Sequence, residues 1–98
     1  MIYPMFAPGH VIARYQDGDK IGWPAYLKRL WAEEPTRMLA FVHEVAQTMV
    51  IHEPIHVAFE SDGKRLWDGH HRVAAALALG LPSIPVEFHD GNTGRRLE

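Results

Sequence analysis

Residues 55–80 read IHVAFESDGKRLWDGHHRVAAALALG, and this stretch predicts two paired strands followed directly by a helix. Apolar and polar residues alternate well enough over 55–60 for a half-buried strand. Asp62-Gly63 then favours a tight hairpin turn, because both residues tolerate a positive φ angle. Residues 65–68 return as the second strand of the hairpin.

The hairpin leads into a compact, alanine-rich helix over 73–79, whose small side chains permit a close approach to a sheet. Gly80 ends this helix as a C-terminal cap. A last strand is expected over 84–88, with Pro85 at its start or on an edge. The remaining residues, 89–98, are interpreted as a polar tail.

The first half of the chain is expected to be mainly helical. Pro24 suits the first position of a short helix that ends at Trp31. Pro35 begins a longer helix, with apolar residues at helical spacing as far as Met49, and Pro54 stops it. Residues 10–15 are the one strand-like run before these helices.

Ninety-eight residues are enough for one modest core, so residues 1–98 are predicted to form a single domain. The order of elements indicates a small α/β (α+β) fold, in which helices accompany a mixed sheet. A formal net charge of −2 supplies no overall attraction for DNA. The absence of cysteine excludes disulfides, thiolate metal sites and cysteine nucleophiles. No apolar run approaches the roughly 20 residues that span a bilayer, and we expect a cytoplasmic protein with no membrane partner.

The turn Asp68-Gly69-His70-His71-Arg72 carries the clearest chemical signal, because it joins a strand to the start of a helix. The first turn of a helix has free N–H groups and a partial positive charge, so it attracts anions. Gly69 allows a sharp turn and a close ligand, and Arg72 offers a planar fork for phosphate oxygens. His70 and His71 can donate to an oxyanion, and Asp68 can hold a metal ion or accept a proton.

The same turn has a purely structural alternative. Asp68 would then cap the helix, and Arg72 would pair with a carboxylate such as Glu87. His70 and His71 would be ordinary surface residues.

A longer pattern around this turn resembles the ParB/sulfiredoxin superfamily. The resemblance covers residues 37–88: a helix, Pro54-Ile55-His56-Val57, Asp62-Gly63, the five-residue turn at 68–72, an alanine-rich helix, Gly80 and Ile84-Pro85-Val86. It implies a ParB/sulfiredoxin-like fold, in which Gly69, His70, His71 and Arg72 cradle nucleotide phosphates. The implied cofactor is a nucleotide (ATP, ADP or CTP) with Mg²⁺.

The Asp-Gly-His-His-Arg form of the turn resembles a branch that includes nucleotide-dependent free-serine kinases. In that branch a catalytic glutamate precedes the long helix, which carries over to Glu33 or Glu34 as catalytic candidates beside Asp68. Sulfiredoxin chemistry is excluded, because its cysteine is replaced by histidine here. The second arginine of partition-type ParB proteins is also missing from the turn.

These features predict a nucleotide- or phosphate-binding domain, with an ATP-dependent phosphotransferase or NTPase as its activity if it turns over. The alternative is a non-catalytic ParB-like module of a mobile element or phage that binds protein or DNA. Nucleotide, a protein, DNA and a second copy of this chain therefore all stand as candidate partners.

His52-Glu53-Pro54-Ile55-His56 spells the zinc-protease motif H-E-x-x-H. That motif works on a helix, where both histidines share one face, and Pro54 would break such a helix. A site made of His52, His56, His70 and His71 is a further, remote alternative. We therefore predict no metal-binding residues.

Overall fold

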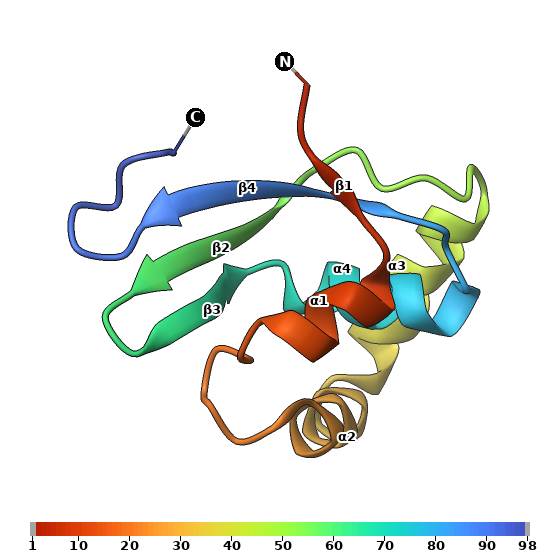
Figure 1. Ribbon diagram of the computed structural model, residues 1–98. Coiled ribbons are helices and arrows are strands. Elements are labelled where there is room, and N and C mark those ends of the chain that lie inside the picture. Colours follow the sequence, from red (N-terminus) through yellow and green to blue (C-terminus); the bar gives the residue numbers. More distant parts are fainter. Residues whose placement is uncertain (1, 98) are drawn as a thin grey trace.

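The computed structural model describes residues 2–97, which form a four-stranded mixed sheet with helices packed against it (Figure 1). The elements are, in order, β1 (Met5–Phe6), α1 (Pro8–Arg14), α2 (Trp23–Glu33), α3 (Pro35–Ala46), β2 (Ile55–Glu60), β3 (Gly63–Asp68), α4 (His70–Leu79) and β4 (Ile84–Asp90). The expected α+β fold class is therefore confirmed.

The strands lie in the order β1-β4-β2-β3. β2 and β3 form the antiparallel hairpin predicted from Asp62-Gly63, and β1 pairs antiparallel with β4. β2 and β4 are parallel, with His56 opposite Glu87 and Ala58 opposite His89. α4 makes the crossover between these parallel strands, as is usual for parallel neighbours.

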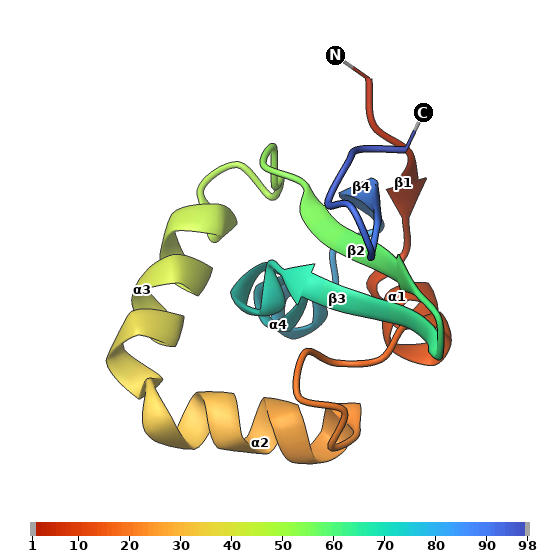
Figure 2. The same cartoon turned by 90° about the vertical axis from the view of Figure 1, so that its left-hand side faces the viewer.

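α4 is the central helix, and α2 and α3 bend around it in an L (Figure 2). Its alanines allow that enclosure, since Ala74, Ala75 and Ala76 are buried. The main core joins side chains of α1, α3 and α4 to the inner face of the sheet; it includes Val11, Val45, Ile55, Val57, Leu66, Val73, Ile84 and Val86. Within residues 2–97, no helix combines the length and apolar character needed to cross a membrane.

Three local expectations were wrong. Residues 10–15 lie mostly in helix α1, because Pro8 is preorganised for its first turn and Val11 packs fully buried in the core. α3 ends at Ala46, and Met49 lies beyond it at a φ of 58°, with its N–H bonded to the Val45 carbonyl. The helical spacing of Met49 was therefore coincidental.

The third correction concerns the end of the chain. β4 continues to Asp90, and residues 91–97 turn back along its edge instead of forming a polar tail, while Glu98 lies outside the described residues. The N–H of Asp90 donates to the Arg95 carbonyl, and that of Leu97 to the Phe88 carbonyl. This return places Arg96 beside His89.

Candidate phosphate-binding site

The turn between β3 and α4 has the backbone conformation that its glycine suggests. Gly69 is the N-cap of α4, at a φ of 104° in the left-handed region. A Cβ there would lie 2.6 Å from Cγ2 of Ile55, so the turn also needs the missing side chain for space. Asp68 Oδ1 accepts the Gly69 N–H at 2.9 Å. Because glycine has no side chain to cap the helix, the first-turn N–H groups of α4 remain available to a ligand.

A cavity of about 370 Å³ opens beside this turn, between α3 and α4. Its lining combines two arginines, two carboxylates and the turn itself: Arg37, Ala40, Phe41, Glu44, Asp68, Gly69, His71 and Arg72. A volume of this size is within the range of small-molecule sites.

A second cavity, of about 380 Å³, shares Phe41, Glu44 and Arg72 with the first. Most of its other lining residues lie in the turn after α3 and include apolar side chains: Val45, Thr48, Val50, Ile51, His52 and Glu53. The two cavities adjoin through Arg72. The first is lined by more charged side chains, and the second adds the apolar side chains of the turn after α3.

Arg72 reaches across this junction. Its Nη1 donates to the Pro54 carbonyl at 3.0 Å, which fixes the guanidinium against the loop before β2. The expected alternative, an ion pair with Glu87, was wrong, because Glu87 instead lies beside His89 and Arg96. Arg72 lines both cavities, so its guanidinium lies where a ligand in either of them could reach it.

His71 and Arg37 hold Glu34 at the rim of the first cavity. Glu34 Oε2 lies 3.0 Å from His71 Nε2, and its Oε1 accepts from Arg37 Nη1 at 3.0 Å. The hydrogen bond from His71 and then that from Arg37 lower the pKa of Glu34, so its carboxylate is charged at neutral pH. Neither glutamate lines the cavity itself; Glu34 is linked to it through His71 and Arg37, whereas Glu33 is exposed on α2.

His70 is turned away from the cavity, although it belongs to the same motif. Its Nε2 accepts the Gly18 N–H at 2.8 Å, and its ring stacks on Tyr26 with centroids 4.5 Å apart. Burial lowers the pKa of His70, which suits a ring that must stay neutral to accept this hydrogen bond. His70 therefore holds the loop before α2 and, unlike Gly69, His71 and Arg72, does not line the cavity.

That loop depends on a buried residue that the sequence did not single out. Asp17 is 1% exposed, and its carboxylate accepts three backbone N–H bonds, from Asp19, Ile21 and Gly22. It stabilises the irregular path between α1 and α2. Its place before Gly18 indicates a turn, but not the burial.

The sequence also left out Arg37 and Glu44 as site residues. They are seven residues apart on α3, so they share a helical face, with Phe41 between them. That spacing was visible in the sequence. It indicates a binding site only because α4 packs against this face of α3.

The two zinc patterns are not assembled. His52 and Glu53 lie in the exposed loop before β2, so the H-E-x-x-H motif is not on a helix. The four histidines considered together lie in different environments, with His70 at Gly18, His71 at Glu34 and His56 at His89.

Comparison of the chain with protein-family models, with curated proteins and with solved structures found no match. The site is therefore interpreted through its own geometry, together with the motif at residues 68–72.

Proposed function

We propose that this protein binds a nucleotide, with its phosphates in the cavity between α3 and α4. The observation that carries this proposal is the convergence of Arg37, Arg72 and the glycine-capped start of α4 on one cavity. Both guanidinium groups can form paired hydrogen bonds to phosphate oxygens, and the first-turn N–H groups add donors of the same kind.

The carboxylates of the cavity favour a metal-bound nucleotide over a bare phosphate. Asp68 and Glu44 line the same space as the arginines, and their charges would repel an isolated anion. Mg²⁺ is usually held by one or two carboxylates together with substrate phosphates. A Mg²⁺–nucleotide complex would match this mixture of charges, with Asp68 as the proposed metal contact.

The adjoining cavity gives the rest of the nucleotide a place to bind. Phe41 and Arg72 border both spaces, while Val45 and Ile51 supply apolar surface in the second. A base or ribose placed there would keep its phosphates within reach of the α4 turn. This arrangement uses both cavities for one ligand.

Phosphoryl transfer is the proposed activity, in line with the resemblance to free-serine kinases. Such transfer depends mainly on positioning and on charge stabilisation, which Arg37, Arg72 and a bound metal ion would provide here. Asp68 would contact the metal or accept the proton of an attacking hydroxyl. Glu34 bonds to both His71 and Arg37, which lower its pKa, and would hold these two side chains in place as contacts for the phosphates.

A thermal-shift panel of ATP, ADP, CTP and GTP, each with Mg²⁺, tests the binding proposal. A nucleotide at ten times its Kd should stabilise the fold by about 1.4 kcal/mol, which raises the Tm by about 6–11 °C for a domain of this size. Arg37→Ala should remove most of this shift without harming the fold, since the Arg37 side chain is 68% exposed. Arg14→Ala, an exposed arginine of α1 away from the cavity, is the matched control.

The proposal fails if no nucleotide raises the Tm at millimolar concentration, or if Arg14→Ala and Arg37→Ala reduce the shift equally. Turnover has its own readout, the release of phosphate or the formation of phosphoserine from free serine. Asp68→Asn should abolish that product while the nucleotide-dependent shift remains detectable.

A further inference from the structure

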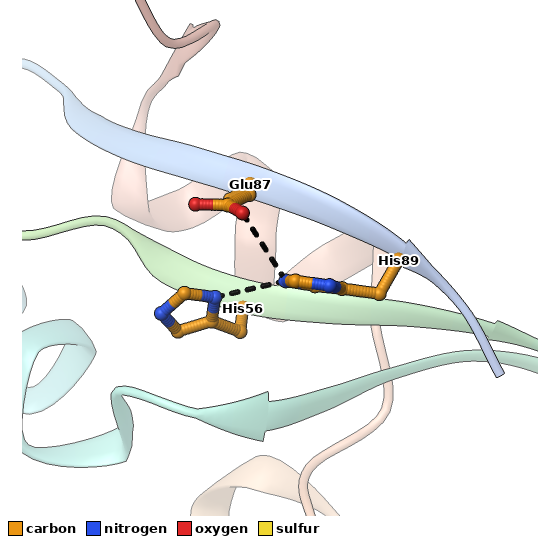
Figure 3. A group of neighbouring side chains, drawn as sticks. All are labelled: His56, Glu87 and His89. Carbon is orange, nitrogen blue, oxygen red and sulfur yellow. Dashed lines mark hydrogen bonds and ion pairs between the residues drawn. The ribbon is translucent and has the colours of Figure 1, made fainter. Parts of the chain in front are cut away.

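A second cluster of chemically active side chains lies on the sheet, outside the cavity between α3 and α4. His56 comes from β2, and Glu87 and His89 come from β4 (Figure 3). Glu87 and His89 are two residues apart, so they point to the same side of their strand. His56 is the register partner of Glu87 across the parallel pair, which brings the third side chain to the same face.

The three side chains converge through their polar atoms. His56 Nδ1 lies 2.9 Å from His89 Nε2, and Glu87 Oε1 lies 3.8 Å from the same Nε2. All three of these groups offer a ligand atom within 4.8 Å of the others. They are the only such group of three among the histidine and acidic side chains of residues 2–97.

We propose that His56, Glu87 and His89 bind one divalent transition-metal ion, for which Zn²⁺ is the closest match. Tetrahedral Zn²⁺ with bonds of about 2.0–2.2 Å keeps its ligand atoms roughly 3.3 Å apart. The two distances to His89 Nε2, 2.9 and 3.8 Å, lie on either side of that value. Small side-chain rotations would therefore complete the coordination without moving the strands.

The ligand set itself points to this class of metal. Two imidazoles and one carboxylate are a known zinc combination that leaves a fourth position for water. Imidazole suits Zn²⁺, Cu²⁺, Ni²⁺ and Fe²⁺, whereas Mg²⁺ and Ca²⁺ prefer oxygen ligands alone. The site should therefore bind Zn²⁺ in preference to Mg²⁺, the ion proposed for the cavity between α3 and α4.

The surroundings partly shield the cluster from water. The side chains of Glu87 and His89 are 15% and 14% exposed, and Trp67 of β3 stacks on the His89 ring with centroids 6.0 Å apart. Both imidazoles can coordinate while neutral, because each ring can carry its proton on the nitrogen remote from the metal. The two histidines would then exchange their mutual hydrogen bond for two metal bonds.

One neighbouring charge opposes the metal. Arg96 Nε lies 3.5 Å from Glu87 Oε1, the oxygen nearest His89. A bound cation would compete with the guanidinium for this carboxylate. Arg96→Gln should therefore bind Zn²⁺ several-fold more tightly, while the backbone bridge between residues 89 and 96 is kept.

Isothermal titration of the tag-free protein with Zn²⁺ tests the site, and Co²⁺ adds the d–d absorption of a tetrahedral complex. The wild-type chain should bind one equivalent of metal. Because outer contacts of a metal site already alter affinity by about 10–100-fold, Glu87→Gln and His89→Ala should each weaken binding by about 10-fold or more. His52→Ala, an exposed histidine of the preceding loop, is the matched control and should bind as the wild type does.

Glu87→Gln is nearly the same size as the wild-type residue, so far-UV circular dichroism of the metal-free variant should match the wild type. The inference is overturned if the wild-type chain binds no Zn²⁺ at millimolar concentration. It is equally overturned if folded Glu87→Gln keeps wild-type affinity, or if His52→Ala loses as much affinity as His89→Ala. Excess Mg²⁺ should leave Zn²⁺ binding unchanged, and displacement by Mg²⁺ would contradict the proposed ligand set.

Discussion

Replacement of Gly69 by alanine should destabilise the fold by about 2–5 kcal/mol, the sum of two effects that the structure separates. The left-handed conformation, with φ at 104°, costs a residue with a Cβ roughly 1–2 kcal/mol. The new Cβ would also lie 2.6, 2.9 and 3.0 Å from Cγ2, Cβ and Cα of Ile55. Such overpacking costs typically about 1–3 kcal/mol, because Ile55 is fully buried and cannot move aside freely.

The loss is large beside the whole stability of such a chain. At about 0.05–0.15 kcal/mol per residue, a domain of this length unfolds with roughly 5–15 kcal/mol. Gly69→Ala should therefore shift the urea midpoint strongly while leaving the m-value unchanged. Urea unfolding followed by circular dichroism measures both quantities.

Two other glycines provide internal controls. Gly80 also has a positive φ, 65°, but a Cβ there would meet nothing within 4 Å, so only the conformational part of the cost applies. Gly9 has neither a positive φ nor a close neighbour, and within α1 its replacement by alanine should stabilise by about 0.5–1 kcal/mol. If Gly69→Ala costs no more than Gly80→Ala, the close packing of the turn against Ile55 is refuted.

Two further predictions concern the loop before α2. Burial lowers the pKa of His70 from its usual 6.5, so the unfolded chain takes up a proton first as the pH falls. The contribution of His70 to the free energy of unfolding should be complete above pH 6.5 and decline below it, by at most about 1.4 kcal/mol per pH unit. Urea titrations between about pH 7.5 and pH 5.5 should therefore show a shallower decline of stability for His70→Gln than for the wild type. An unchanged profile would contradict the neutral, buried role of the ring. Asp17→Ala should destabilise by about 2–4 kcal/mol, because it removes three bonds from backbone N–H groups to a buried carboxylate. Asp62→Asn weakens an exposed pair with Lys20 and keeps a residue suited to the hairpin turn, so it should change the urea midpoint little. An equal effect of the two variants would remove the special role of Asp17.

The second half of the fold was predictable because its signals are local. Asp62-Gly63 specifies the hairpin turn, and Gly80 ends α4 at a φ of 65°. Pro54 likewise separates the loop after α3 from β2. Each of these residues restricts the backbone by its own chemistry, whatever surrounds it.

The N-terminal error has a different origin. Residues 10–15 have a strand-like composition, and α1 forms because Pro8 starts a helix whose Val11 is buried in the core. Packing of α1 against α4 favours the helical conformation of this segment, and sequence periodicity does not reveal such a tertiary contact. The polar end of the chain misled in the same way, since its order comes from hydrogen bonds to the edge of β4.

The candidate site was half predictable. Gly69, His71 and Arg72 are close in sequence and line the same cavity. His70 lies between them in the sequence but points away from the cavity, toward Gly18. Arg37 comes from another helix, and only the docking of α3 on α4 brings it to the turn. The cluster of His56 and His89 was hidden for the same reason, because the two residues are 33 positions apart.

The most direct test of the central claim is to locate a bound Mg²⁺–nucleotide by NMR of the ¹⁵N-labelled protein. The account predicts that the amide signals of residues 69–72 and the side-chain Nε–H signals of Arg37 and Arg72 shift most, and saturate with a single Kd. Arg37→Ala should weaken that Kd while the amides of β4 stay unmoved. Shifts centred away from the α3–α4 cavity, or no shifts at millimolar nucleotide, would contradict the proposed site.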